Sequence, residues 1–290
     1  MMTNPPTQMS EKFEQLDGIW LLKEHLYQEN TGQKQLWDQI GQNYYGRGQF
    51  NRQPPADYRD AIGRPGGLWN ELPIEREYNS ILEIGCGDGR ASIHLSKNRG
   101  LDCQQYCGID ISEPQLRRLQ VFKTAYDFYP SAQFTLICMP AKELPLPDAS
   151  VDLVISDAVF MHLTKTDLCF LMKEVRRVLK PGGLLGFRNS FHNRECLGHI
   201  IRNFARRFAP NRNPLYSYQH SLSEVYDLFE QSDLNDPENP IQIKPNGQYR
   251  LLPHHLGQKK VPFAQTINEW AKANNFKANR SVYSFDVYNW

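Results

Sequence analysis

Residues 80–98 join a short apolar run, a glycine-rich turn and a helical pattern, and this combination limits the folds open to the chain. The apolar run Ser80–Ile84 has the length of a buried strand, and residues 85–89 read Gly-Cys-Gly-Asp-Gly. Because glycines carry no side chain, the backbone can turn tightly there and a ligand can approach it closely. The helix that follows begins with free backbone N–H groups. The sequence therefore predicts a strand–loop–helix unit whose loop contacts a ligand.

Strands and helices continue to alternate down to residue 187. Four more apolar runs of strand length follow, at 105–109, 134–138, 151–155 and 184–187. One intervening helix is introduced by Ser112-Glu113-Pro114-Gln115, which has the spacing of a capping box, and another by Thr164-x-x-Asp167. This alternation predicts an α/β fold with a parallel sheet covered by helices on both faces. Ligands of such sheets bind at the carboxyl ends of the strands.

The regions on either side of this alternation are less regular. Residues 11–42 show a helical spacing of apolar side chains, and residues 46–68 contain Gly and Pro throughout, which predicts a loop. Beyond the fifth strand, we expect a helix over 221–231 and a strand over 282–290. We therefore divide the chain into an N-terminal segment, a core and a C-terminal segment: 1–75, 76–190 and 191–290.

The charge balance and the cysteine content exclude several classes of protein. Lys and Arg number 33 and Asp and Glu 32, so the net charge is +1 and no general attraction to nucleic acid or membranes is expected. The chain has no apolar run of about 18 residues, and its first residues lack the apolar stretch of a secretory signal. The six cysteines form no Cys-x-x-Cys pair, which argues against a metal site or a disulfide framework. We expect a cytoplasmic protein without a metal.

The glycine loop and the acid after the second strand suit a nucleoside ligand. The loop reads G-x-G-x-G, one residue shorter than the dinucleotide fingerprint, and this form favours a ligand with an amino-acid tail and no pyrophosphate. Asp110 follows Gly89 by 21 residues (110 − 89), at a strand end where its carboxylate can accept both hydroxyls of a ribose. The spacing between Gly89 and Asp110 alone fits both a dinucleotide and a nucleoside that carries an amino-acid tail. The alternative interpretation is a glycine turn followed by an Asp that caps a helix.

Three blocks of sequence together resemble the class I S-adenosylmethionine-dependent methyltransferases, in particular the branch that methylates small molecules. The blocks are ILEIGCGDG (81–89), GIDIS (108–112), and LPLPDASVDLVIS (144–156) with EVRRVLKPGGLL (174–185). The resemblance implies a Rossmann-like fold with a mostly parallel seven-stranded sheet. It also implies that 1–75 forms a helical cap, that 76–190 binds S-adenosyl-L-methionine, and that 191–290 carries an acceptor-binding insert and the last strands.

Carried over by position, the resemblance implies a set of residues that bind the methyl donor. Glu83 would orient the methionine amino group, directly or through water, and Asp110 would hold the ribose hydroxyls. Tyr45, with the neighbouring Tyr44, would close over the donor, although ordinary docking of the N-terminal helix explains these tyrosines equally well. The remaining contacts would come from the glycine loop, from the residue that packs on adenine and from the end of the fourth strand: Gly85, Cys86, Gly87, Ile111, Ser156 and Asp157.

The chain departs from the family pattern at the residues expected to meet the adenine. Where the family often has Gly-Asp-Ala, with the Asp reaching adenine N6, this chain has Met139-Pro140-Ala141. Proline supplies neither a carboxylate nor an N–H group. We therefore expect Pro140 and Ala141 to contact the adenine through backbone groups and apolar packing.

A hydroxyl or ammonium acceptor must lose a proton during methylation, so we searched for a general base after strands four and five. His162 is the best-placed candidate, with packing or helix capping as its alternative role. Asp157 is closer to the donor, where it could instead contact the donor or cap the turn. His192 follows the fifth strand and could line the acceptor pocket, although hydrogen bonding within a loop also accounts for it.

These features support three hypotheses about function. The first is an S-adenosylmethionine-dependent methyltransferase that modifies an oxygen or nitrogen of a small molecule, with S-adenosyl-L-homocysteine as the product. The second is a tRNA or other RNA methyltransferase that uses the arginines between Arg202 and Arg212, although no strongly basic stretch or added RNA-binding module supports it. The third is a subunit that binds the donor without catalysing a reaction. No sequence feature specifies an oligomeric state.

Overall fold

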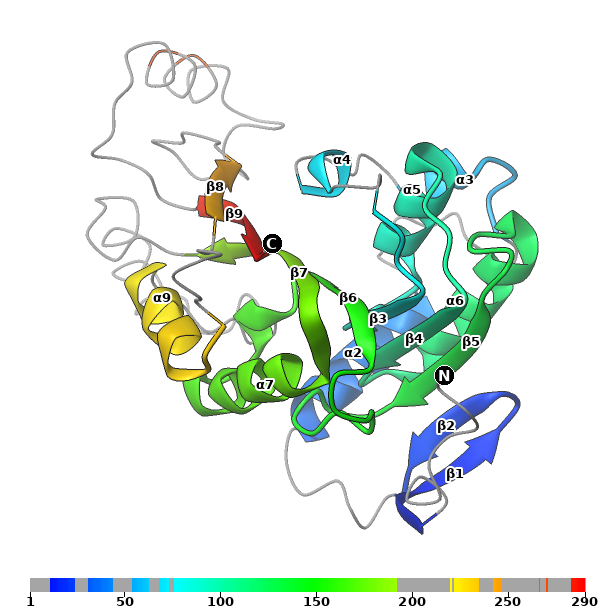
Figure 1. The fold of residues 1–290 in the computed structure, drawn as a ribbon. Coiled ribbons are helices and arrows are strands. Elements are labelled where there is room, and N and C mark those ends of the chain that lie inside the picture. The colour runs from blue at the N-terminus through cyan, green and yellow to red at the C-terminus, as the bar shows by residue number, and fades with distance from the viewer. Residues whose placement is uncertain are drawn as a thin grey trace.

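The computed structural model places a single large sheet at the centre of the chain (Figure 1). It describes residues 11–23, 31–43, 54–62, 68–72, 76–191, 220, 222–234, 242–246, 266, 270 and 283–289. The strands are β1 (Phe13–Leu16), β2 (Ile19–Leu22), β3 (Ser80–Ile84), β4 (Gln105–Asp110), β5 (Gln133–Cys138), β6 (Val151–Asp157), β7 (Leu179–Phe191), β8 (Gln242–Asn246) and β9 (Tyr283–Asn289). The helices are α2 (Thr31–Asn43), α3 (Tyr58–Ile62), α4 (Leu68–Glu71), α5 (Arg90–Arg99), α6 (Glu113–Tyr126), the 3₁₀ turn η2 (Phe160–His162), α7 (Lys165–Val178) and α9 (Leu222–Gln231).

The sheet has the strand order β1-β2-β5-β4-β3-β6-β7-β9-β8. Strands β5, β4, β3, β6 and β7 run parallel, whereas β9 lies antiparallel between β7 and β8. The seven strands from β5 to β8 are the mostly parallel sheet expected from the sequence, and this expectation is confirmed. The strand order reverses at β3, which has β4 on one side and β6 on the other, so the carboxyl ends of these strands flank a crevice of the kind that binds ligands.

A hairpin extends the sheet at its β5 edge and corrects the helix expected over 11–42. Strand β2 pairs in parallel with β5, and β1 pairs with β2 in antiparallel register. The turn between them consists of Asp17 (φ 50°) and Gly18 (φ 82°), both left-handed, as a two-residue hairpin turn requires. The Asp-Gly pair between apolar residues was the signal for this hairpin, and only the second half of the expected helix forms, as α2.

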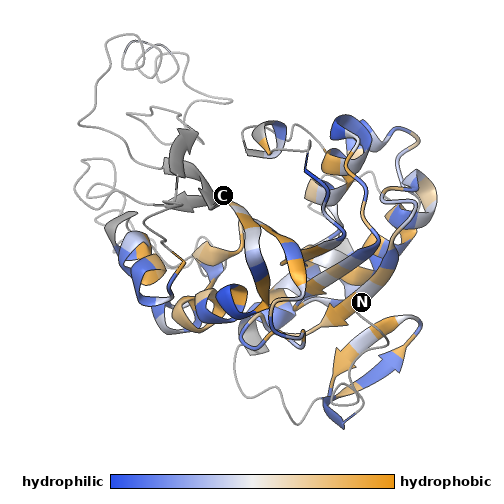
Figure 2. Cartoon of the chain, viewed as in Figure 1, coloured by the Kyte–Doolittle hydropathy of each residue, from blue (hydrophilic) through white to orange (hydrophobic). Residues whose placement is uncertain are grey.

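Each face of the sheet is covered by its own hydrophobic core. Helices α5 and α6 lie on one face with α3 and α4, and α7 and α9 lie on the other (Figure 1). Neighbouring residues of a strand alternate between the two cores: Ile81 belongs to the first and Leu82 to the second. Hydrophobic residues accordingly concentrate along the central strands (Figure 2). No helix of the described residues combines the length and the apolar character needed to cross a bilayer.

The two predicted helix starts are formed by different interactions. Thr164 caps α7 as expected, because its hydroxyl accepts a hydrogen bond from the Asp167 backbone N–H at 3.1 Å. Helix α6 starts after Ser112 as expected, but the Ser112 side chain makes no capping hydrogen bond. Its hydroxyl and Oε1 of Gln115 are both buried without a partner. The capping-box prediction was therefore wrong for α6, although its start position was correct.

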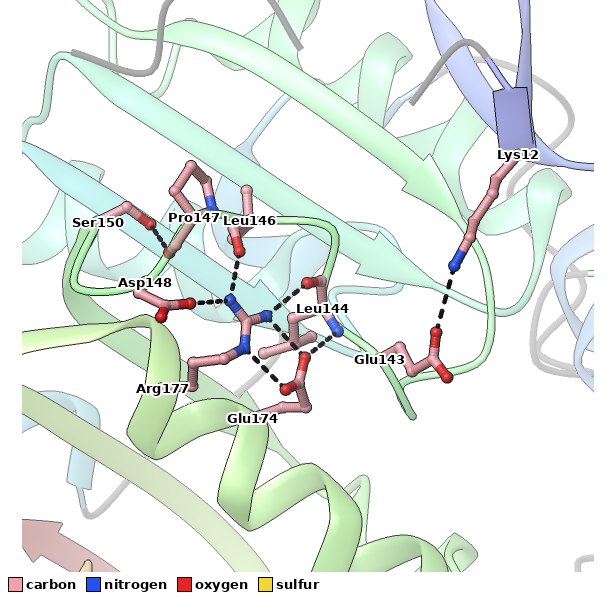
Figure 3. Close-up of polar contacts among 9 residues, drawn as sticks. All are labelled: Lys12, Glu143, Leu144, Leu146, Pro147, Asp148, Ser150, Glu174 and Arg177. Atoms are coloured by element: carbon pink, nitrogen blue, oxygen red, sulfur yellow. Dashed lines mark hydrogen bonds and ion pairs between the residues drawn. The ribbon is translucent and has the colours of Figure 1, made fainter. Parts of the chain in front are cut away.

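Arg177 of α7 fastens the connection between β5 and β6 to the body of the domain. Its guanidinium donates to the carbonyl oxygens of Leu144 (2.8 Å) and Leu146 (2.7 Å), and to the carboxylates of Asp148 and Glu174 (Figure 3). Glu174 in turn accepts a hydrogen bond from the Leu144 backbone N–H at 2.8 Å. The connection begins immediately after the end of β5, so this cluster fixes the backbone that leads away from the expected adenine contacts.

We expect Arg177→Met to lower the free energy of unfolding by about 2 kcal/mol, because two carbonyl oxygens and the Glu174 carboxylate lose a charged donor. Urea unfolding followed by circular dichroism measures this change. Arg176→Met is the matched control, since Arg176 lies on the same helix and is exposed to solvent. Equal unfolding free energies for the two variants would show that the cluster contributes nothing to stability.

Candidate functional site

A cavity of about 230 Å³ lies at the carboxyl ends of β3, β4 and β6. Its walls come from the glycine loop, from the residues that follow β4, β5 and β6, and from α2. The lining residues are Gln33, Trp37, Gly85, Gly87, Ile109, Asp110, Ile111, Gln115, Met139, Pro140, Ala141, Asp157, Ala158, Val159, His162 and Leu163. The structure thus brings together Gly85, Gly87, Asp110, Ile111, Pro140, Ala141, Asp157 and His162 from the sequence-predicted set.

The glycine loop is held against the end of β4 and against the turn after β6. The backbone N–H groups of Gly85 and Cys86 both donate to the Ile109 carbonyl, at 2.7 and 3.1 Å. A Cβ on Gly85 would lie 2.1 Å from a methyl group of Val159, and the residue has a φ of 65°. Only glycine satisfies both conditions, so Val159 can pack directly on the loop and close one side of the cavity.

Asp110 has the surroundings expected of a carboxylate that binds two hydroxyl groups. One oxygen accepts the Gly87 backbone N–H at 2.8 Å, and the other accepts the Ser112 backbone N–H at 2.9 Å. Because each oxygen has about two lone pairs, each retains one for a ligand. Burial raises the pKa of Asp110 to about 6, against the effect of the two hydrogen bonds.

The residues after β5 present a largely apolar wall. Met139 is buried, Pro140 and Ala141 are half-buried, and all three line the cavity. Pro140 contributes its carbonyl oxygen to a hydrogen bond with the Lys142 backbone N–H at 2.9 Å. Ile111, at the end of β4, adds a further apolar side chain to the same cavity. This wall is suited to packing against a flat ring.

Glu83 lies in a different environment from the one that the resemblance implies. It is 2% exposed, its carboxylate accepts hydrogen bonds from the hydroxyls of Ser92 and of Tyr106 (2.6 Å to the latter), and it does not line the cavity. Burial raises the pKa of Glu83 to about 7, which the two hydroxyl donors only partly oppose. The carboxyl group therefore ties β3 to α5 and β4.

Asp157 and His162 line the cavity in the segment that follows β6. The Asp157 carboxylate accepts hydrogen bonds from Arg188 Nε (2.8 Å) and Nη2 (2.5 Å) and from Trp69 Nε1 (3.2 Å). The ring of His162 makes an edge contact with the Trp37 ring, with centroids 5.2 Å apart. The backbone between these two residues turns at Ala158, which has a φ of 60° and donates its N–H to the Arg188 carbonyl.

Besides Glu83, two described residues of the sequence-predicted site, Ser156 and Cys86, do not line the cavity. Ser156 is buried and donates its hydroxyl to the Ile84 carbonyl at 3.1 Å, which links β6 to β3. The Cys86 side chain is 4% exposed and belongs to the core on the α5 face. Tyr45 and His192 lie outside the described residues.

Several lining residues were not predicted from the sequence. Helix α2 contributes Gln33, whose side-chain amide donates to the His162 carbonyl at 2.7 Å, and Trp37. Gly41 of the same helix packs against α6, where a Cβ would come within 2.9 Å of Pro114. The close approach of α2 to α6 places α2 over the cavity. The remaining unpredicted residues are Ile109, Gln115, Met139, Ala158, Val159 and Leu163.

The cavity fits the cofactor that the resemblance implies. The Asp110 carboxylate has free lone pairs for the ribose, the wall of Ile111, Met139 and Pro140 suits an adenine, and the two glycines allow the donor to lie close to the backbone. Gln115 lines the cavity, and its Oε1 atom is buried without a hydrogen-bond partner. This amide oxygen is therefore available to accept a hydrogen bond from a ligand.

We expect the affinity for S-adenosyl-L-homocysteine to rise with pH through about 6, because only the ionised Asp110 carboxylate accepts both ribose hydroxyls. The dissociation constant at pH 5 should be about tenfold higher than at pH 7.5. Isothermal titration calorimetry at several pH values measures this dependence. Asp110→Asn should bind more weakly and lose this pH component, and an unchanged profile in that variant would contradict the assignment.

We expect burial of Glu83 to make the fold less stable as pH rises. Its pKa is higher in the folded protein than in the unfolded chain, so the contribution is fully present below about pH 4.5 and is lost as pH rises through about 7. The loss amounts to about 3 kcal/mol. The difference in unfolding free energy between Glu83→Gln and the unmodified chain should therefore increase from pH 4.5 to 7.5 in urea titrations. A difference that is constant with pH would show that burial does not raise the pKa of Glu83 in the folded protein.

Comparison with known proteins identifies the region that forms this site. The family described as "Methyltransferase domain" matches residues 82–187. The 2-methyl-6-phytyl-1,4-hydroquinone methyltransferase of Synechocystis is 30% identical over 185 residues, which cover 58% of this chain and 54% of that protein. The tRNA N(3)-cytidine methyltransferase of Bos taurus is 31% identical over 124 residues, covering 41% and 32%. The chain thus spans about half or less of the length of these relatives.

A solved structure supports the same conclusion about the fold. Phosphoethanolamine N-methyltransferase 2 of Haemonchus contortus, in complex with S-adenosyl-L-methionine, has a TM-score of 0.53 and 17% identity, covering 80% of this chain and 55% of that one. The three proteins are named for different acceptors, and the likeness to the solved structure is a likeness of fold. Residues 82–187 therefore form a domain of the class I S-adenosylmethionine-dependent methyltransferase family, and the cofactor of that family is S-adenosyl-L-methionine.

Proposed function

We propose that the chain transfers the methyl group of S-adenosyl-L-methionine to an oxygen or nitrogen of a small-molecule acceptor by in-line displacement. The observation that supports this most directly is that one cavity is lined by both Asp110 and His162. The residue proposed to bind the ribose and a residue with a side chain that can accept a proton therefore line the same cavity. When bound, the cofactor supplies an electrophilic methyl group on a sulfonium.

Alignment and exclusion of water are the main tasks left to the protein in such a reaction. Trp37 and Gln33 of α2 cover the cavity, and Val159 and Leu163 close it from the segment after β6. Val159 rests on Gly85, so this wall cannot move without the glycine loop. We infer that α2 acts as a cap over the donor.

His162 is the general base in this proposal. Its backbone is held by Gln33, and its ring lies edge-on to Trp37, so two residues of α2 define the position of the imidazole. Neutral imidazole can take the proton that a hydroxyl or ammonium acceptor must lose. Asp157 is less suited to this role, because Arg188 and Trp69 already donate hydrogen bonds to both oxygens of its carboxylate.

The acceptor is proposed to be small and partly apolar. The residues of the cavity beyond Asp110 and Asp157 are mostly apolar, the net charge of the chain is +1, and one relative is named for a hydroquinone acceptor. The segment 191–280, including His192, is the proposed source of further acceptor contacts. The arginines of 202–212, on which the RNA hypothesis depends, lie outside the described residues.

The proposal is tested by incubating the full chain and a cell lysate with S-adenosyl-L-methionine labelled in its methyl group. We expect label in the low-mass fraction, which then provides a product to identify. Label in nuclease-sensitive material would instead support the RNA hypothesis. Binding of S-adenosyl-L-homocysteine without label transfer to any fraction would support the non-catalytic subunit.

Once an acceptor is known, His162→Gln tests the assigned base. We expect kcat to fall by about 100-fold or more with the dissociation constant of S-adenosyl-L-homocysteine unchanged, because the base acts on the acceptor alone. His94→Gln is the control, since His94 lies on α5, contacts Asn70 and Asn98, and does not line the cavity. An unchanged kcat in His162→Gln would show that this histidine is not the general base and contributes to packing instead.

A further inference from the structure

The charged amino-acid end of the donor should lie at the end of β6, if the proposed function is correct. Asp110 holds the ribose at the end of β4, and β3 stands between β4 and β6 in the sheet. A donor that starts on Asp110 and crosses the glycine loop therefore reaches Asp157, the last residue of β6. Asp157 lines the same cavity as Gly85 and Gly87.

Most of the backbone N–H groups of the glycine loop are not available to this end of the donor. They are used within the protein, by the Ile109 carbonyl, the Asp110 carboxylate and the Cys86 carbonyl. The groups concerned are those of Gly85, Cys86, Gly87 and Gly89. Side chains must therefore supply much of the recognition of the amino-acid end.

Glu83, to which the resemblance assigns the methionine amino group, is poorly placed to bind it. Its carboxylate is enclosed, accepts two hydroxyl hydrogen bonds on one oxygen and does not line the cavity. Its raised pKa also means that a substantial fraction of the carboxyl groups is neutral near pH 7. A neutral, enclosed acid has little attraction for an ammonium group.

Asp157, unlike Glu83, lines the cavity. Arg188 and Trp69 together occupy three of the approximately four lone pairs of the Asp157 carboxylate, one on Oδ1 and two on Oδ2. We propose that Asp157 accepts a hydrogen bond on Oδ1 from the α-ammonium group of the donor, and that Arg188 is the positioning residue that holds this carboxylate in place. The bidentate contact fixes the plane of the carboxylate, so the remaining acceptor direction is fixed as well.

Calorimetric binding of two nucleosides distinguishes this contact from a general effect on the fold. S-adenosyl-L-homocysteine carries the amino-acid end, whereas 5′-methylthioadenosine is a thioether of the same nucleoside without it. We expect Asp157→Asn to weaken S-adenosyl-L-homocysteine about tenfold or more and to leave 5′-methylthioadenosine within about twofold. Arg188→Met should lower the ratio of the affinity for S-adenosyl-L-homocysteine to that for 5′-methylthioadenosine several-fold, because the guanidinium no longer holds the Asp157 carboxylate in place.

Asp152→Asn is the matched control, since Asp152 lies on the same strand in a similar ion pair, with Lys180, and does not line the cavity. It should change neither affinity. Equal weakening of both nucleosides by Asp157→Asn, or a selective loss in Glu83→Gln instead, would overturn the assignment of the ammonium contact. If the unmodified chain binds neither nucleoside, the proposed function itself fails.

Discussion

The two backbone hydrogen bonds to Asp110 are the interaction around which the site is organised. Gly87 and Ser112 approach the carboxylate from different sides, one from the loop after β3 and one from the start of α6. A buried carboxylate is costly unless its oxygens accept hydrogen bonds, so the loop and the helix must adopt these positions together. The loop in turn determines where Val159 can pack, and thereby places the segment that carries His162.

The sequence predicted the central part of the fold well because that part depends on local patterns. Buried strands, the glycine loop and the Thr164 cap each have a signature within a few residues, and all three were confirmed. The hairpin β1–β2 was missed because the apolar spacing around it also fits a helix, and the Asp17-Gly18 pair is a short signal within that spacing. The position of α2 over the cavity depends on packing between Gly41 and Pro114, which no local pattern encodes.

The candidate site was predicted less evenly, for a related reason. Residues whose backbone meets the ligand, such as Gly85 and Gly87, follow from the loop motif itself. The role of a side chain depends on its partners, and these come from distant parts of the chain. Glu83 was assigned to the donor by its position in the motif, yet its partners are Tyr106 and Ser92, and neither carries a signal of its own.

Glu83, Asp110 and Asp157 lie at the ends of neighbouring strands but have different roles. The hydrogen-bond donors around each carboxyl group determine its role. Glu83 has only hydroxyl donors, which stabilise the ionised carboxylate weakly, so the effect of burial on its pKa is larger. Its carboxyl group links elements of the protein interior. Asp110 has two backbone N–H donors, which favour a carboxylate that keeps room for a diol. Asp157 has a guanidinium as its partner, and the bidentate contact holds this carboxylate in a fixed orientation at the cavity. The partner that each acid finds in the fold, more than its place in the motif, determines its chemistry.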